Sequence, residues 1–350
     1  MAPASSSWVI LGRVPRVTAA DADLPPGADL SLALPAPPRV ATLTIPPRIF
    51  PARTTSDNFP AVVAVDPTGL LLLHADQCRT TGPTIVDTAG NQSFGWRPFV
   101  AGYFVLDATT ASALPLPKPE LILHSGHLAS SPPRGVAATT WSLSSSPSSA
   151  VRRAPSYASR PTSESGLWWV DLSWCLLTCD PFEDAPVLRV VPLPPGKVLK
   201  CREGWGFLDK YRCVRVSGGK LRFLDMYRNR NSQGAAQISV WTLADPESTE
   251  WTLEYEATFA EICNDASYKA TGLPKKIPVL GLIHPINPDV VYFFLDKHLL
   301  GIDVRARKVV ECEVYELVAP PSEHLATRFV HAWQLPRALS CSGNSIFHPL

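Results

Sequence analysis

Short apolar runs, each followed closely by an aspartate, recur along the chain. They occupy residues 61–65, 103–106, 167–170, 176–177, 290–295 and 299–302, and the aspartates are Asp66, Asp107, Asp171, Asp180, Asp296 and Asp303. A further apolar run follows each aspartate. An aspartate suits a tight turn because its side chain accepts hydrogen bonds from backbone N–H groups just downstream. The pattern therefore predicts strands that are joined by aspartate-led turns.

Units of this kind, about 40–50 residues long with several strands each, are typical of β-propeller blades. The sequence thus predicts an all-β fold, a β-propeller-like array of small antiparallel sheets, over residues 59–339. Residues 1–58 form a Pro/Ala-rich segment for which we expect one strand at residues 39–45 and otherwise an extended, surface-lying path. Residues 340–350 are expected to be a C-terminal tail.

The clearest period-two alternation lies between residues 211 and 255. Val214 and Val216 precede a Ser-Gly-Gly-Lys turn at residues 217–220, and a second alternating run follows it. Trp241 and Trp251 lie on either side of a turn at residues 245–249, which predicts a hairpin. We expect these two tryptophans to pair across the hairpin.

One short helix is predicted, together with Pro-rich loops. Thr258 and Glu261 have the spacing of a capping box, in which each side chain bonds the backbone N–H of the other residue. The helix is expected to run for two or three turns and to end before Gly272.

Composition narrows the class of protein. The 36 prolines among 350 residues exclude long helices, and a net charge of +1 gives no field to attract nucleic acid. The apolar runs are far shorter than the ~20 residues of a membrane span. Eight cysteines without a basic, signal-like N-terminus indicate reduced thiols. We therefore expect a soluble intracellular protein of the cytoplasm or nucleus, without nucleic-acid or membrane partners.

The Ser-rich stretch at residues 142–165 departs from the strand pattern. It has almost no large apolar side chains, so its composition predicts a disordered surface loop. Within it, Arg152, Arg153 and Ser156 match the pattern of a basophilic kinase site, although such strings are common by chance.

Four cysteines are the candidate zinc ligands: Cys175, Cys179, Cys201 and Cys213. If residues 175–179 form a strand, the first two lie about 13 Å apart, whereas thiolates that share a zinc ion lie under about 4 Å apart. Core cysteines are the better interpretation. His124 and His127 lack a third ligand at a suitable spacing, so a surface turn is favoured there, and we expect no metal site and no cofactor.

Three tryptophans, Trp168, Trp169 and Trp174, are candidates for a binding platform. Adjacent residues of a strand face opposite sides, so Trp168 and Trp169 cannot share one surface. Burial between neighbouring sheets is the favoured interpretation for them.

No catalytic pattern is present. The chain lacks HExxH, GxSxG and Rossmann glycine motifs, and Lys220 belongs to a hairpin turn because the upstream glycine of a P-loop is missing. An alternative to a non-enzymatic protein is a site at the centre of the propeller, formed by aspartates of distant turns such as Asp107, Asp180 and Asp303. Turn chemistry already accounts for those residues.

Three strings together resemble the plant, grass-expanded proteins that carry domain of unknown function 1618. They are LWWVDLSWCLLTCDPFEDAPVLRVVPLPPG, SYKATGLPKKIPVLGLIHPINPDVVYFFLDKHLLGIDV and RFVHAWQLP, and the resemblance extends from Trp8 to Leu339. ISVWTLADPESTEWTLEYEATF is also similar to a hairpin of F-box-associated propeller domains. The resemblance implies a β-rich, propeller-like fold and no established activity. Cys175 replaces an expected glycine, and the Ser-rich run replaces a patterned strand.

The function that this sequence favours is a non-enzymatic, adaptor-like protein-interaction module. A propeller without catalytic side chains mainly offers surfaces to partners. We expect one or more protein partners and a monomeric chain. The alternative is a small-ligand binder or enzyme with its site at the centre of the propeller.

Overall fold

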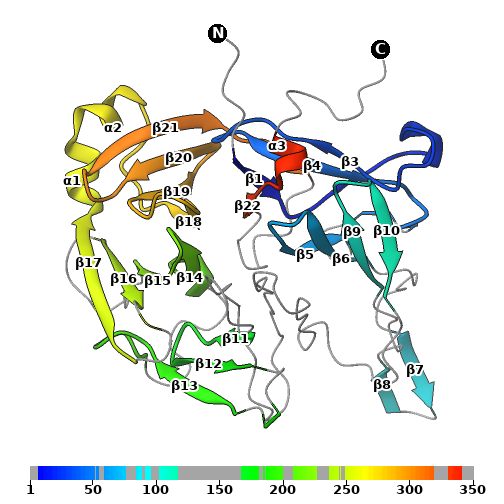
Figure 1. Ribbon diagram of the computed structural model, residues 1–350, viewed down its shortest axis with the longest axis horizontal. Helices are drawn as coiled ribbons and strands as arrows, with labels where there is room; N and C mark the ends of the chain where they lie inside the picture. The colour runs from blue at the N-terminus through cyan, green and yellow to red at the C-terminus, as the bar shows by residue number, and fades with distance from the viewer. Residues whose placement is uncertain are drawn as a thin grey trace.

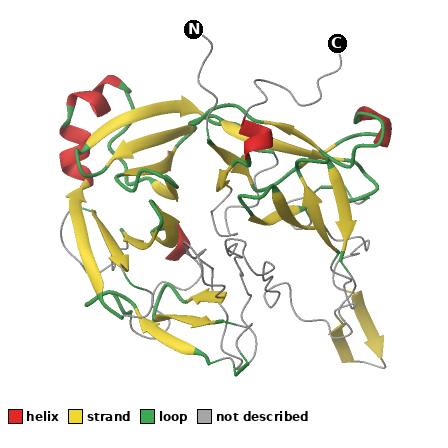
Figure 2. Cartoon of the chain, viewed as in Figure 1, coloured by secondary structure: helices red, strands yellow, loops and turns green. Residues whose placement is uncertain are grey.

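The computed structural model is mainly β, with few and short helices (Figure 2). It describes residues 7–51, 53–54, 59–75, 84–88, 91–95, 102–116, 167–180, 184–185, 187–199, 208–226, 236–243, 245, 249–318 and 330–340. Within these residues, none of the helices is both long and apolar enough to cross a membrane. The segment at residues 142–165, His124, His127 and Cys201 lie outside the described residues.

Four small antiparallel sheets are arranged like propeller blades (Figure 1). They are numbered 2 to 5 in chain order, because the sheet that contains β1 (Trp8–Gly12) is sheet 1 and is described below. Sheet 2 contains β5 (Ala61–Val65), β6 (Leu70–His74), β9 (Tyr103–Asp107) and β10 (Ser112–Pro115). Sheet 3 contains β11 (Leu167–Val170), β12 (Cys175–Cys179) and β13 (Arg189–Pro192). Sheet 4 contains β14 (Arg212–Ser217), β15 (Lys220–Asp225), β16 (Gln237–Leu243) and β17 (Trp251–Thr258). Sheet 5 contains β18 (Val279–Ile283), β19 (Val290–Leu295), β20 (His298–Asp303) and β21 (Lys308–Val314). The predicted fold class and the predicted strands are thereby confirmed.

A fifth, mixed sheet joins the two ends of the chain. Sheet 1 contains β1 (Trp8–Gly12), β2 (Arg16–Val17), β3 (Ser31–Ala33), β4 (Val40–Ile45) and β22 (Val330–Gln334). β1 pairs with β22 in antiparallel fashion and with β4 in parallel fashion. The predicted strand at residues 39–45 is confirmed as β4.

The expected surface-lying path of residues 1–58 is wrong for the part of it that the structure describes. Val9, Ile10 and Leu11 of β1 are buried. The sequence does not show this burial, because β22, the antiparallel partner of β1, lies more than 300 residues away. The expected domain limit at residue 59 falls between sheets 1 and 2.

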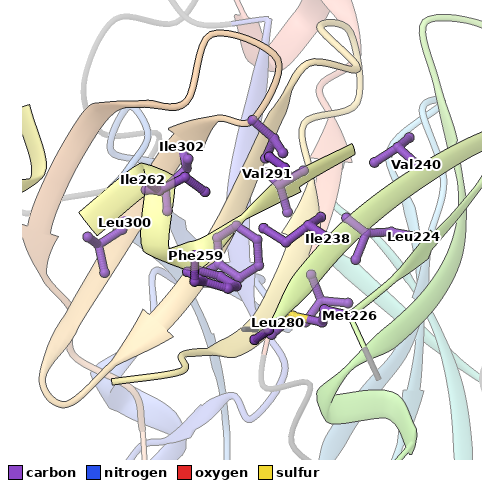
Figure 3. Close-up of a cluster of buried hydrophobic side chains, with 14 of the residues drawn as sticks. Leu224, Met226, Ile238, Val240, Phe259, Ile262, Leu280, Val291, Leu300 and Ile302 are labelled. Atoms are coloured by element: carbon purple, nitrogen blue, oxygen red, sulfur yellow. The ribbon is translucent and has the colours of Figure 1, made fainter. Parts of the chain in front are cut away.

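Five apolar clusters join the sheets into a ring. Sheets 1 and 2 share one cluster around Trp333, sheets 3 and 4 share one around Trp168, and sheets 4 and 5 share the cluster of Figure 3. Sheets 5 and 1 meet around Trp8, and Trp169 of sheet 3 packs against sheet 2. Strands β14, β18, β22 and β5 contact one another in this order, which is the arrangement of adjacent blades around a centre (Figure 1).

The cluster between sheets 4 and 5 is formed by buried side chains of both sheets and of one helix. Leu224, Ile238 and Val240 of sheet 4 face Leu280 and Val291 of sheet 5 (Figure 3), and all five are buried. The helix α1 (Phe259–Asn264) adds Phe259 and Ile262 to the same cluster (Figure 3).

The predicted hairpin of β16 and β17 is confirmed, but the predicted tryptophan pair is wrong. Trp241 lies opposite Leu253, and Trp251 lies opposite Leu243. Both tryptophans still belong to the cluster between sheets 3 and 4. The pairing of Leu243 with Trp251 next to the turn sets this register, and the alternation of the sequence does not specify it.

The predicted capping box is confirmed. The backbone N–H of Glu261 donates to Thr258 Oγ1 at 3.2 Å, and the Thr258 N–H donates to Glu261 Oε2 at 2.8 Å.

The single predicted helix is instead two helices, separated by Asp265 in an extended conformation. Asp265 accepts a hydrogen bond from the Ser267 N–H and thereby starts the second helix, which its short polar side chain favours over continuing the first. The helices of the described residues are α1 (Phe259–Asn264), α2 (Ala266–Ala270) and α3 (Arg337–Ser340), with 3-10 turns at Asp21–Asp23 and Leu208–Lys210. A separate hairpin pairs β7 (Thr84–Thr88) with β8 (Asn91–Gly95).

Candidate functional site

Sheet 3 has three described strands, whereas sheets 2, 4 and 5 have four each. One face of sheet 3 packs against sheet 4 through Trp168, Leu176 and Val191. On the opposite face, the register places Trp169, Leu177 and Val190 across from one another. Trp169 packs against sheet 2, but Val190 on the outer strand is 54% exposed. This face is therefore covered near β11 and open at β13.

Exposed apolar side chains are frequent in the sequence on either side of this outer strand. Among the described residues, five of the 13 exposed large apolar side chains lie between residues 174 and 198: Trp174, Val187, Leu188, Val190 and Val198. We call these five residues the β13 surface. Single exposed apolar residues are ordinary on a protein, but a group of them usually marks an interaction site.

The edge of β13 has only part of the usual protection of edge strands. Natural edge strands carry lysines, inward charges or prolines that prevent pairing with another chain. Between residues 187 and 191, Arg189 is the only charged residue and no proline occurs; the proline lies at the end, at Pro192. Within the described part of the chain, β13 pairs with β12 alone. One edge of β13 can thus accept a further strand.

A buried ionic network positions both loops beside β13. Arg212 donates from Nε to Asp225 at 2.7 Å, and from Nη1 to the carbonyl oxygens of Leu172 at 2.8 Å and Lys197 at 2.9 Å. Lys197 Nζ lies 2.9 Å from the second oxygen of Asp225. The loop of Trp174 and the loop of Val198 are in this way fixed to sheet 4. Sequence reasoning missed the network, because Arg212 precedes an apolar run and carries no motif.

The tryptophans are placed as the alternation predicts. Trp168 is buried between sheets 3 and 4, and Trp169 is half-buried against sheet 2, which confirms burial between neighbouring sheets. Trp174 is 52% exposed and contributes to the β13 surface. The candidate platform is therefore represented by Trp174.

Three of the four candidate zinc ligands lie within the described residues. Cys175 and Cys213 are buried, and Cys179 is half-buried at the end of β12. Burial, followed by the nearby charge of Asp171, raises the pKa of Cys175. In the part of the chain that the structure describes, no three His, Cys, Asp or Glu side chains gather into a possible metal site.

The aspartates cap turns of separate sheets. Asp107 accepts from the N–H and the hydroxyl of Thr109 at 2.8 and 2.6 Å, and Asp303 accepts from the Ala306 N–H at 2.7 Å. Burial opposes ionisation of Asp107, but the hydrogen bonds from Thr109 outweigh it and lower the pKa of Asp107. Asp107 belongs to sheet 2, Asp180 follows a strand of sheet 3, and Asp303 belongs to sheet 5. The aspartate-led turn is confirmed as a structural device.

Residues 169–292 match the family model described as "Protein of unknown function (DUF1618)". This segment is similar to the DUF1618 family. The match begins at Trp169, includes the whole β13 surface and all of sheet 4, and ends at Tyr292 in β19. The expected resemblance is therefore shown over about a third of the chain. No curated protein matches the chain.

The DUF1618 match coincides with the part of the ring that contains the candidate site. Sheets 1 and 2 lie outside the matched residues, and the β13 surface lies inside them.

Proposed function

We propose that this chain is a protein-interaction module and that its β13 surface binds an extended segment of a partner protein. The observation that supports the proposal is the combination of an edge of β13 that pairs with no other described strand and exposed apolar side chains at Val187, Leu188 and Val190. A peptide that adds to such an edge gains main-chain hydrogen bonds, and its alternate side chains contact the exposed valines and leucine. The bound peptide would be the fourth strand of sheet 3. In sheets 2, 4 and 5 this chain provides all four strands.

An adaptor-like role inside a plant cell is also part of this proposal. The similarity to F-box-associated propeller domains suggests this role. The role is supported by the sequence resemblance and by the propeller-like arrangement, which presents its edges and turns to the outside. A monomeric state also belongs to the proposal.

The proposal is tested by photo-crosslinking in cells. A benzoylphenylalanine residue at position 190 should crosslink to a reproducible protein, whereas the same residue at position 310 should not. Val310 is the matched control, because it lies on the outer strand of sheet 5 and is 52% exposed. The substitution Val190→Lys should reduce copurification of that protein at least about tenfold, since a lysine on an edge strand opposes further pairing, and Val310→Lys should leave it unchanged.

Two outcomes would contradict the proposal. One is the same set of crosslinked proteins from positions 190 and 310. The other is undiminished copurification with Val190→Lys. A crosslink from position 190 to a second copy of this chain would replace the partner by self-association.

A further inference from the structure

The turn between β18 and β19 contains a histidine where equivalent turns contain an aspartate. Asp66 follows β5, Asp171 follows β11, and His284 follows β18, so each residue comes directly after the first strand of its sheet. The backbone N–H of each donates across its turn: Asp66 to Leu70 at 2.9 Å, Asp171 to Cys175 at 2.8 Å, and His284 to Val290 at 3.0 Å. The three side chains hence begin equivalent turns.

The side chain of His284 also takes over the capping role of the aspartates. Its Nδ1 accepts hydrogen bonds from the N–H groups of Ile286 and Asn287, both at 3.0 Å. Asp171 accepts in the same way from the Ser173 N–H at 2.8 Å. A carboxylate keeps its acceptor oxygens well below neutral pH, but Nδ1 of an imidazole accepts only while it carries no proton. The His284 turn depends on a neutral ring.

The ring of His284 lies where three sheets meet. Its centroid is 4.5 Å from the ring of Trp8 in sheet 1 and 6.4 Å from that of Tyr292 in sheet 5. Its carbonyl oxygen accepts from the hydroxyl of Ser217 in sheet 4 at 2.6 Å, and the neighbouring Pro285 carbonyl accepts from the Gly218 N–H at 2.9 Å. A change in this turn therefore reaches sheets 1, 4 and 5 together.

The charged groups around this turn are already paired. Asp289, in the same turn, lies 3.0 Å from Nε of Arg305, which belongs to the connection between β20 and β21. Glu311 of β21 accepts from the hydroxyl of Tyr292 at 2.6 Å. From sheet 1 the indole of Trp8 contacts the imidazole of His284, and from sheet 4 the hydroxyl of Ser217 contacts the His284 carbonyl oxygen. Both groups are neutral. No neighbouring carboxylate is thus placed to compensate a charged imidazole among the described contacts of His284.

We propose that protonation of His284 breaks the turn between β18 and β19 and weakens the contacts among sheets 1, 4 and 5. This part of the protein is therefore destabilised by acid. Burial lowers the pKa of His284. A folded-state pKa below the ordinary value of about 6.5 means that the stabilisation is complete above that pH. It is lost as the pH falls through the folded-state pKa.

A second histidine acts in the same direction. His74 of sheet 2 is packed 5.0 Å from the ring of Tyr103. Burial, followed by the charge of Arg13 from sheet 1, lowers the pKa of His74 to about 4. Acid therefore affects sheet 1 at both of its neighbours, beside Trp8 and beside Arg13.

Hydrogen exchange of the full chain, measured by mass spectrometry between pH 7 and pH 5 and corrected for intrinsic exchange, tests the proposal. Protection of residues 284–290 should fall about tenfold in the wild-type chain, because each proton that the imidazole binds favours the open turn. In His284→Asn the amide oxygen takes the place of Nδ1 and does not titrate, so the change should stay below about twofold. His298→Gln is the matched control, because it removes a half-buried histidine of sheet 5 outside this turn and should keep the tenfold change.

The proposal is overturned if His284→Asn shows the wild-type pH dependence, or if protection in the wild-type chain does not change. A measurement on the wild-type chain alone covers the case in which the variant does not fold. Nitrogen NMR of labelled histidine should show Nδ1 of His284 without a proton at pH 7. A proton on Nδ1 at that pH would equally refute the idea.

Discussion

A single buried arginine connects the candidate site to the rest of the ring. Arg212 is 2% exposed, and its side chain binds Asp225 and the carbonyl oxygens of both loops beside β13. A buried charge is costly unless it is fully paired, and here every contact of the guanidinium ends on an oxygen. The network is thus a device for positioning Trp174 and Val198.

Replacing this arginine should be strongly destabilising. Arg212→Met removes the donor to the carbonyl oxygens of Leu172 and Lys197 and the ion pair with Asp225. We expect the free energy of unfolding to fall by about 3 kcal/mol, as for other buried pairs that lose one partner. Urea denaturation followed by tryptophan fluorescence measures it. Lys220→Met, at an exposed position of the neighbouring strand, should change the value by less than about 0.5 kcal/mol; similar losses in the two variants would show that the network contributes little.

At the scale of single elements, the start of α1 is defined by its capping box. Thr258→Ala removes the acceptor of the Glu261 N–H, so the free energy of unfolding should fall by about 1 kcal/mol. The same urea titration detects this change. A variant as stable as the wild-type chain would contradict a role for the cap.

The cap also carries a pH dependence. Hydrogen bonds from Thr258, backbone first and side chain second, lower the pKa of Glu261. Because the folded-state pKa is depressed, the stabilisation is present above the ordinary pKa of a glutamate and is lost as the pH falls through the lower value. Glu261→Gln keeps a neutral acceptor oxygen, so α1 should lose this part of its pH dependence, which circular dichroism between pH 6 and pH 3 can follow.

Elements that depend on neighbouring residues were predictable from the sequence. The turn at Asp107 was predicted, because its acceptor and its donors lie within three residues. The β16–β17 hairpin was predicted for the same reason. The register of Trp241 was not predicted, because alternation does not specify which residues of two strands lie opposite each other. The break at Asp265 was not predicted either, because a side-chain cap competes there with helix continuation.

The candidate site could be predicted only in part. The sequence of residues 187–192 is compatible with a strand. It does not show that this strand lies at the edge of its sheet among the described residues. The role of His284 was also hidden, because its equivalence to Asp66 and Asp171 depends on hydrogen bonds across turns of different length. These features arise from tertiary arrangement rather than from local pattern.

At the scale of the whole molecule, Trp333 marks the closure of the ring. It lies on β22, is fully buried between sheets 1 and 2, and donates from Nε1 to the carbonyl oxygen of Asp66 at 2.8 Å. The pairing of β22 with β1 thereby becomes a contact between the first two sheets of the chain.

Trp333→Ala should reduce the free energy of unfolding by about 3–5 kcal/mol, because it leaves a large cavity at this junction. Trp333→Phe keeps most of the packing and loses the hydrogen bond, so a loss of about 1 kcal/mol is expected. Thermal and urea unfolding of both variants give the comparison. Equal losses in the two would indicate that the hydrogen bond, rather than the packing, stabilises the closure.

The pairing of β1 with β22 also determines the order of events during synthesis. Trp8–Gly12 leaves the ribosome more than 300 residues before Val330–Gln334, which at about 5–20 residues per second is a delay of tens of seconds. Throughout that interval Val9, Ile10 and Leu11 lack β22, which is one of the two strands that pair with β1 in the folded protein. The nascent chain therefore has to keep an exposed strand edge from aggregating until β22 has been synthesised, and chaperones that hold unpaired strands are expected to act on it at this stage.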